Sequence, residues 1–239
     1  MIPQTVIVVA LIIFVGAAVQ SMIGFGMALV AMPLMVTVLG IQLASPSFAL
    51  VGITGTFMNV LRWHSDITWR DITMLIIPAL IGVPLGVMFL SRSDPQLVTR
   101  ILGVVLVAYA LLSLLGRSVP TGTSPIWGYL AGFFSGALTG AFNAGGPPIV
   151  AYASGRNWQP DRFKGNLAIF FFIMGLAVVA SHAFSGHLTA EVWRITLLAL
   201  PALYLGQLTG VFLGKRISPV RFNQVVLVLL VVLGIQLLI

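Results

Sequence analysis

The chain lacks cysteine, long polar stretches and most of the charge that a soluble protein carries. With no cysteine in 239 residues, disulfide bonds, thiolate metal sites and thiol catalysis are excluded. Charged residues make up 7% of the chain, against roughly a quarter in an ordinary soluble domain. Because 59% of the residues are hydrophobic and no polar stretch is long enough to fold a domain, we expect an all-α, polytopic protein embedded in a lipid bilayer.

Acidic residues are especially scarce, and all five lie in or beside expected loops. They are Asp66, Asp71, Asp94, Asp161 and Glu191. Without a carboxylate inside an apolar run, proton coupling through an intramembrane acid is not expected. A pathway driven by the gradient and the membrane potential fits better, and a cation held by backbone carbonyls stays open.

Eight apolar runs are near the roughly 20 residues that a spanning helix needs. They cover residues 5–23, 44–61, 72–90, 101–115, 125–142, 167–183, 195–213 and 225–239. Two shorter apolar pieces, 27–39 and 147–154, follow the first run of each half and are too short to cross unaided. We therefore expect about eight spanning helices, with a broken or re-entrant segment in each half.

The net charge of +7 does not indicate a nucleic-acid partner, because Lys and Arg are dispersed among short loops. Such residues act as topology signals, since cytoplasmic loops are enriched in Lys and Arg. Basic residues precede the run at 167–183 and recur two crossings later, which predicts that this face is cytoplasmic. They are Arg156, Arg162, Lys164, Lys215, Arg216 and Arg221.

The two halves, 1–118 and 119–239, carry similar patterns. Trp69-Arg70 and Pro78 in the first half match Trp193-Arg194 and Pro201 in the second. Further matches are Gly82 with Gly206, Gly86 with Gly210, Gly16 with Gly132, Gly24 with Gly140, and Pro33 with Pro148. An internal repeat of interrupted apolar segments is typical of transporters. The repeat is inverted if the short pieces turn back and parallel if they continue the preceding helix, and the helix breaks favour inversion.

Each half contains a segment expected to break a helix within the membrane. One is Gln20–Gly26, and the other is Thr139–Pro148, where Asn143 is followed closely by two glycines and two prolines. Glycine and proline favour a helix that stops and restarts, and a restarted helix directs free amides and its positive dipole end into the break. Irregular backbone at that depth must be buried or line a cavity, so we expect an anion site there. The candidate site residues are Gln20, Ser21, Gly24, Phe25, Gly26, Thr139, Asn143, Gly145, Gly146 and Pro147.

Several of these features have simpler interpretations. Glycines spaced by four, such as Gly82 with Gly86 and Gly132 with Gly136, commonly allow close packing of membrane helices, and such faces are compatible with a homodimer. Arg162 and Lys164 could attract the anion from the cytoplasm or serve only as topology signals. His182 and His187 lie near the end of the apolar run 167–183. This position favours packing at the membrane interface over a role in pH sensing.

Two motifs resemble a known family. The segments Gly136-Ala-Leu-Thr-Gly-Ala-Phe-Asn-Ala-Gly-Gly-Pro-Pro-Ile-Val-Ala-Tyr152 and Gly24-Phe-Gly-Met-Ala-Leu-Val-Ala-Met-Pro-Leu34, in a duplicated arrangement, are similar to the TauE/SafE family of membrane transporters. The resemblance implies movement of small sulfur-containing anions, such as sulfite, sulfoacetate or taurine, across the bacterial inner membrane. This chain has Met27-Ala28 where many members carry further glycines.

Two alternatives to a transporter stay open. A passive anion channel would share the site but conduct without saturation or conformational switching. An intramembrane serine hydrolase would need Ser135 or Ser181 activated by His182, but no acid or oxyanion motif accompanies either pair. No pattern indicates a metal or an organic cofactor, and the chain is not expected to be an enzyme.

Overall fold

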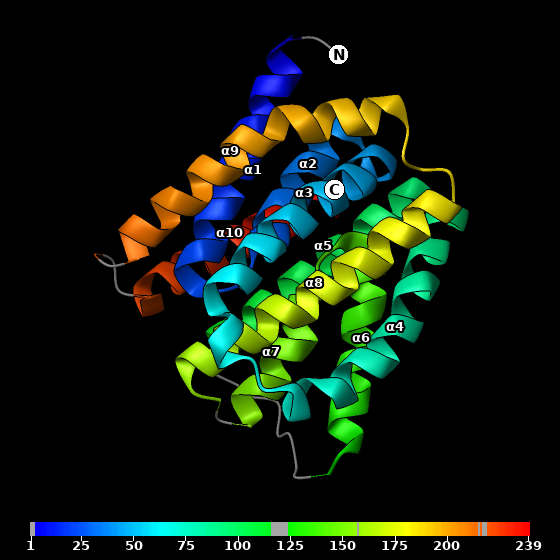
Figure 1. Cartoon of the computed structure of the whole chain (residues 1–239). Helices are drawn as coiled ribbons and strands as arrows, with labels where there is room; N and C mark the ends of the chain where they lie inside the picture. Colours follow the sequence, from blue (N-terminus) through cyan, green and yellow to red (C-terminus); the bar gives the residue numbers. More distant parts are fainter. Residues whose placement is uncertain (1–2, 116–123, 157, 215, 217–218) are drawn as a thin grey trace.

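The described part of the chain is an assembly of α-helices, shown in Figure 1. This computed structural model describes all residues except 1–2, 116–123, 157, 215 and 217–218. In chain order its helices are α1 (Pro3–Ile23), α2 (Met27–Leu39), α3 (Ile41–Trp63), the 3-10 helix η1 (His64–Asp66), α4 (Trp69–Arg92), α5 (Pro95–Leu114), α6 (Ile126–Phe142), α7 (Gly146–Gly155), α8 (Pro160–Phe184), α9 (Ala190–Gly214) and α10 (Pro219–Gln236).

Six of the described helices are long and apolar enough to cross a membrane: α1, α3, α4, α5, α8 and α9. The expected number was about eight. The runs predicted at 125–142 and 225–239 do form helices, but α6 and the described part of α10, Phe222–Gln236, are shorter than a full span. The two short apolar pieces are confirmed as separate helices, with α2 at Met27–Leu39 and α7 at Gly146–Gly155.

Glycines set two close helix pairs, α4 with α6 and α1 with α9. A Cβ added at Gly82 would lie 2.4 Å from the carbonyl oxygen of Phe133, and one at Gly206 would lie 2.3 Å from that of Phe14. Four residues later, Gly86 and Gly210 approach the next turn of the same partner helices in the same direction. The packing interpretation of these glycines is therefore confirmed. Because they are used within the chain, they offer no face to a second copy.

The middle of the molecule is formed by α3 and α8, which cross in opposite directions. Gly175 lies against Ile53, whereas Gly165, earlier in α8, lies against the end of α3 at Trp63. A second antiparallel pair is formed by α5 and α10. There Gly103 lies against Leu237, while Tyr109 shares a small cavity with Val226.

Helix directions require the two short helices to turn back. Helix α9 runs parallel to α1, and also to α3, because Thr196 approaches Ser47 while Gln207 donates to the carbonyl of Gly55 further along. Helices α1 and α3 thus run the same way, and α2 must carry the chain back between them. The same argument applies to α6 and α8, which both run parallel to α4, so α7 must return the chain.

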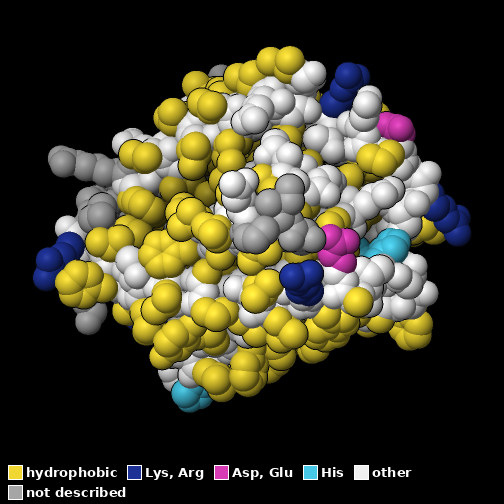
Figure 2. All heavy atoms as spheres, turned by 90° about the horizontal axis from the view of Figure 1, so that it is seen from above, with side chains coloured by type: hydrophobic (Ala, Val, Ile, Leu, Met, Phe, Trp, Pro, Cys, Tyr) yellow, Lys and Arg dark blue, Asp and Glu magenta, His cyan; other side chains and the backbone are white. Residues whose placement is uncertain are grey.

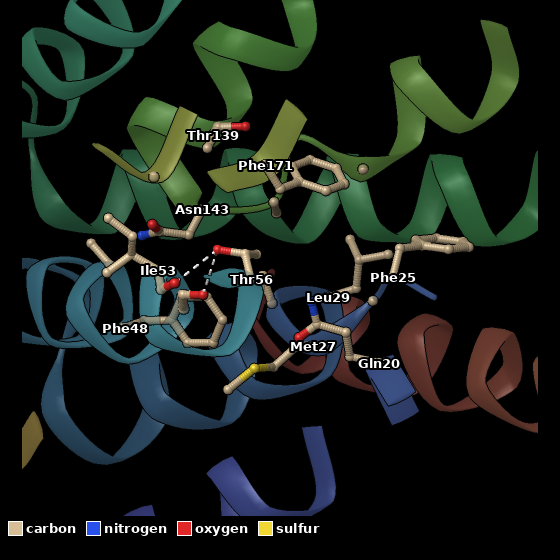
Figure 3. Close-up of a pocket in the computed structure, with 17 residues that line it drawn as sticks. Gln20, Phe25, Met27, Leu29, Phe48, Ile53, Thr56, Thr139, Asn143 and Phe171 are labelled. Carbon is tan, nitrogen blue, oxygen red and sulfur yellow. Dashed lines mark hydrogen bonds between the residues drawn. The ribbon is translucent and has the colours of Figure 1, made fainter. Parts of the chain in front are cut away.

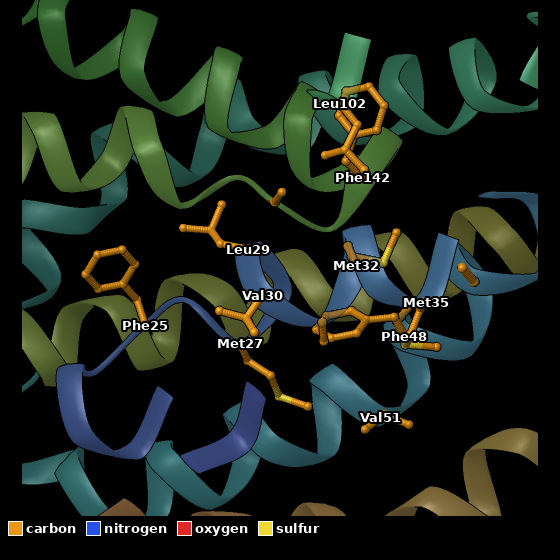
Figure 4. Packing of buried hydrophobic residues seen from close by; sticks show 14 of the residues in the cluster. Phe25, Met27, Leu29, Val30, Met32, Met35, Phe48, Val51, Leu102 and Phe142 are labelled. Atoms are coloured by element: carbon orange, nitrogen blue, oxygen red, sulfur yellow. The ribbon is translucent and has the colours of Figure 1, made fainter. Parts of the chain in front are cut away.

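Burial follows the membrane setting. Figure 2 shows one face of the molecule with hydrophobic side chains over much of it and only a few, scattered charged groups. Many large apolar side chains are exposed, such as Leu11 and Ile77, as expected for surfaces in contact with lipid tails. Inside, Figure 4 shows Phe25, Leu29 and Phe48 packed around the breaks and the short helix α2. The breaks are therefore held by a packed interior.

Candidate functional site

The expected helix breaks are present, and each contains backbone in the left-handed region. In the first, Gly24 has φ 98° and Gly26 has φ 100°. In the second, Asn143 ends α6 with φ 55° and is the only described non-glycine residue with positive φ. Glycine adopts this conformation without steric cost, and asparagine tolerates it better than most residues. These residue types are what allow the two helices to end inside the molecule.

The second break is fixed by a small polar cluster. The hydroxyl of Ser135 donates to the carbonyl of Gly145 at 2.5 Å, and that of Thr139 donates to the carbonyl of Ser135 at 2.7 Å. A Cβ at Gly145 would lie 1.9 Å from Thr139 Oγ1. Gly145 thus acts by leaving room for its neighbours, and it supports the site without lining the cavity.

Both restarted helices direct their N-termini toward one space, but they offer different numbers of amides. The first backbone hydrogen bond of α2 runs from the N–H of Val30 to the carbonyl of Gly26. The amides of the three preceding residues are therefore unsatisfied helix-end donors. In α7 the residues after Gly146 are Pro147 and Pro148, which have no N–H. The first break accordingly provides more backbone donors than the glycine- and proline-rich second break.

A cavity of about 70 Å³ lies between the breaks and the crossing of α3 and α8 (Figure 3). By the same measure one water molecule needs roughly 10–15 Å³, so the space accepts a small polyatomic solute. Its described lining is Gln20, Phe25, Gly26, Met27, Ala28, Leu29, Phe48, Ala49, Gly52, Ile53, Thr56, Thr139, Asn143, Ala144, Gly146, Phe171 and Gly175. None of these residues is charged, so any ionic partner there would be bound by dipoles and amides.

Six of the ten predicted site residues line this cavity: Gln20, Phe25, Gly26, Thr139, Asn143 and Gly146. The other four, Ser21, Gly24, Gly145 and Pro147, lie in or beside the breaks but not on the cavity wall. The prediction missed the walls supplied by α3 and α8, including Phe48, Gly52, Thr56, Phe171 and Gly175. In a chain this apolar, such residues carry no local signal that separates them from ordinary core positions.

Two carboxamides distinguish the polar part of the cavity. Asn143 Nδ2 donates to the backbone oxygen of Ser45 at 3.1 Å and to its hydroxyl at 3.0 Å, which joins the second break to the start of α3. Gln20 is 7% exposed, and its Oε1 has no hydrogen-bond partner among the described residues. A buried polar atom without a partner is costly, and because rotation of the carboxamide exchanges its oxygen and its NH2 group, Gln20 is able to turn its Nε2 donor toward a bound anion.

The two basic residues expected to attract an anion each have a partner within the chain. Arg162 forms an ion pair with Asp71, which also lies 3.5 Å from the amide of the buried Asn166. The Lys164 ammonium lies 4.7 Å from the centre of the Trp63 ring, and the Lys164 stem covers Gly24. Attraction of an anion by these residues stays a prediction. In the structure Lys164 packs against the first break, whereas Arg162 joins the start of α8 to the start of α4.

The serine–histidine pairs considered for a hydrolase do not form. The hydroxyl of Ser135 donates to the carbonyl of Gly145 and that of Ser181 donates to the carbonyl of Ala177, so neither hydroxyl is hydrogen-bonded to the His182 ring. His182 instead approaches Ser45, which the sequence did not single out. Among the described residues no carboxylate oxygen lies within 4.0 Å of a histidine nitrogen, and none of them form a group of three or more metal-ligating side chains.

Comparison with known proteins decides the family. A sequence model for the sulfite exporter TauE/SafE family matches residues 8–237, nearly the whole chain. The protein belongs to the TauE/SafE family. A curated relative from Cupriavidus necator, named "Probable sulfite/organosulfonate exporter TauE", is 25% identical over 230 residues, which cover 93% of this chain and 89% of the relative. No solved structure matches the chain.

Membership confirms the resemblance that the two motifs indicated. TauE/SafE proteins are transporters, so this chain is a multi-pass transporter of the bacterial inner membrane and not an enzyme. In this TauE/SafE protein the segment Gly136–Tyr152 is the end of α6, the second break and most of α7, and the segment Gly24–Leu34 is the first break and the start of α2. Both motifs that carry the resemblance therefore meet at the cavity.

Proposed function

We propose that the protein transports small sulfur-containing anions, sulfite or an organosulfonate such as sulfoacetate, bound in the cavity between the two helix breaks. The observation that carries the proposal is an uncharged cavity toward which two helix N-termini and two carboxamides converge. Helix N-termini bind oxyanions through free amides and the helix dipole. The substrate class is taken from the printed name of the relative.

The cavity suits a solute with an oxyanion head and a short carbon stem. The amides of Met27, Ala28 and Leu29 could donate to the oxygens of the head, with Gln20 and Asn143 on its other sides. The walls made by Phe48 and Phe171 are apolar and could accept the carbon stem of an organosulfonate. An anion that is held by dipoles and not by a fixed cation can also leave readily, which transport requires.

Flux in proteoliposomes tests this function. The purified protein is challenged with sulfite, sulfoacetate, taurine, sulfate and acetate, with current and counterflow as readouts. We expect saturable flux and counterflow for sulfite or an organosulfonate but not for acetate. Flux without saturation would favour the passive channel, and no flux with any sulfur compound would overturn the proposed substrate class.

We also propose that the chain is an inverted repeat. Each half runs through a helix, a three-residue break, a short returning helix and three further helices. The close pair α4–α6 then corresponds to α9–α1, while α3 with α8 and α5 with α10 are pairs of equivalent helices that cross in opposite directions. Equivalent helices would be parallel if the two-fold axis lay along the membrane normal, so this arrangement supports an axis in the membrane plane.

The cavity fits the same symmetry. Phe48 and Gly52 in α3 have the same spacing as Phe171 and Gly175 in α8, and both pairs line the cavity. The substrate would thus lie on the pseudo-two-fold axis, where a modest rocking of one half against the other changes the side from which it is reached.

Single cysteines test the orientation, because the natural chain has none. Ser65 lies at the end where α3 ends and α4 and α8 begin, and Ser185 lies at the opposite end of α8. Described basic residues gather at the Ser65 end, including Arg62, Arg162 and Lys164, so this end is expected in the cytoplasm. In intact cells an impermeant maleimide should label Ser185→Cys, whereas Ser65→Cys should react only after permeabilisation. The reverse pattern would overturn the orientation, and labelling of both from outside would overturn a fixed topology.

A further inference from the structure

A chain of polar side chains leads from the cavity to the end of the molecule where α8 ends, opposite the Ser65 end. Asn143 donates to Ser45 Oγ, which lies 3.4 Å from His182 Nε2. The Nδ1 atoms of His182 and His187 are 2.9 Å apart, and His187 Nε2 lies 3.4 Å from Ser91 Oγ. His182 is fully buried, His187 is half-buried in the loop after α8, and Ser91 is exposed. The chain therefore joins the cavity to solvent.

The short distance between two Nδ1 atoms constrains the protons on this chain. One Nδ1 must carry a hydrogen and the other must accept it. With both rings neutral, one assignment satisfies every contact: the hydroxyl of Ser45 donates to His182 Nε2, His182 Nδ1 donates to His187 Nδ1, and His187 Nε2 donates to Ser91. The hydroxyl of Ser91 in turn donates to the carbonyl of Val87 at 2.7 Å. The neutral pair is thus fully hydrogen-bonded.

One added proton changes the direction of the contact next to the cavity. Every accepting nitrogen of the neutral pair is already occupied, so the added proton takes His182 Nε2, and the hydrogen between the two Nδ1 atoms is shared. His182 Nε2 then donates to Ser45 Oγ. The hydrogen of the Ser45 hydroxyl stays bonded to Oγ but no longer points at His182, so it is free to turn to another acceptor. The pair gains one positive charge and no covalent bond between heavy atoms changes. That charge lies one side chain away from Asn143.

We propose that His182 and His187 form a proton-binding site that is coupled, through Ser45, to anion binding at Asn143. This inference rests on the proposed function, because it names the ion that is bound together with the transported anion. A positive charge beside an anion site favours the anion, and by reciprocity the bound anion favours the proton. The coupling ion is therefore a proton taken up by imidazoles, although the chain has no acidic residue inside the membrane.

Other charged groups do not account for the pair. At this end α4 contributes Arg92, Asp94 caps the start of α5, α5 contributes Arg100, and α9 contributes Glu191 and Arg194, all of them exposed. Helices α3 and α6 present no titratable side chain at this level. In the described ranges no carboxylate lies within 4.0 Å of either ring, so the two imidazoles depend on each other and on Ser45 and Ser91.

The test measures sulfoacetate binding to the full chain in lipid nanodiscs at about pH 5.5 and about pH 8, on either side of the usual histidine range. Sulfoacetate keeps the same charge at both values, because its carboxyl titrates near pH 4. We expect wild-type affinity to be at least about fivefold higher at the lower pH, the scale of a typical coupling. In His187→Gln the difference should fall below about twofold. The matched control is His64→Gln at the other end of the molecule, which should retain the wild-type difference. His64 is exposed, and among the described residues its ring is hydrogen-bonded only to the carbonyl of Leu61.

A second variant, Ser45→Ala, tests the path separately from the imidazoles. It removes the hydroxyl but keeps the backbone oxygen that also accepts from Asn143, so the break retains one of its two bonds to α3. Its pH dependence should also flatten. If both variants keep the wild-type dependence, the coupling is overturned and the transport function stands. If the wild type shows no saturable binding at either pH, the proposed function is overturned, and the coupling with it.

Discussion

Replacing Asn143 with glycine should lower saturable flux of sulfite or sulfoacetate at least about tenfold while leaving the protein folded. Glycine adopts the positive φ of this position without strain, so the helix end is kept and only the carboxamide is lost. Both N–H groups of this carboxamide donate to Ser45, so its loss releases the second break from α3 at the cavity wall, and each change of about 1.4 kcal/mol toward weaker anion binding corresponds to a factor of ten. The measurement is initial flux against concentration in proteoliposomes, normalised to monodisperse protein.

Three further variants separate the carboxamide from the backbone. Asn143→Asp keeps the size of the side chain but adds a negative charge to the cavity, so it should abolish flux. Asn143→Leu should also abolish flux, but positive φ disfavours leucine and folding should suffer as well. Thr54→Val is the control, because the Thr54 hydroxyl donates to the carbonyl of Leu50 and does not line the cavity. Unaltered flux in Asn143→Gly would remove Asn143 from the binding site.

Much of the architecture could be predicted because helix breaks have strong local signals. The first short helix has the predicted bounds, Met27–Leu39, and the second differs by one residue at each end. Glycine at positive φ and proline at a helix start act through their own backbones, so they need no knowledge of the rest of the fold. The number of full spans was less predictable, since α6 ends at its break and is too short by length alone.

The predicted match between Gly24 and Gly140 does not coincide with the two helix breaks. Gly140 lies inside α6, where a Cβ would approach the carbonyl of Val83 at 2.1 Å, while the second break begins at Asn143. Gly132, Gly136 and Gly140 are spaced by four residues. Several alignments of the second half with the first therefore match similar numbers of glycines. The helix ends give a different alignment, in which Gly24 and Asn143 each follow a helix and have positive φ.

The contacts that define the site could not be predicted from local sequence. Asn143 and Ser45 are 98 residues apart, and Ser45 and His182 are 137 apart. Ser45 and His182 are buried in helices whose other residues are mostly apolar, so neither stands out as part of a path. Ser45 and His182 meet beside Asn143 only because α3 and α8 cross. For this reason the sequence favours a simple packing role for His182 and His187, whereas in the fold their rings are hydrogen-bonded to each other.

Replacing Gly145 with alanine should disrupt the second break more than any other single methyl added there. Its Cβ would lie 1.9 Å from Thr139 Oγ1 and 2.3 Å from the backbone oxygen of Ser135. The Thr139 hydroxyl is held by its own bond to that oxygen, and the backbone of α6 cannot move without loosening its contact with α4. Overpacking typically costs about 1–3 kcal/mol. Since 1 kcal/mol shifts the melting temperature by roughly 2–4 °C at this size, we expect a fall of about 5–10 °C, with flux reduced at least about tenfold.

The adjacent glycine provides the matched control for that variant. A Cβ at Gly146 would be 3.4 Å from Phe25 Cδ2, an ordinary contact, and Gly146 is the first residue of α7. Gly146→Ala should therefore melt within about 2 °C of the wild type, although it narrows the cavity. Melting in detergent, followed by intrinsic fluorescence of both variants, gives the comparison. Equal melting temperatures would mean that the second break yields to a methyl group. In that case Ser135 and Thr139 would not fix its geometry, and the carboxamide of Asn143 would not be held in one position beside the cavity.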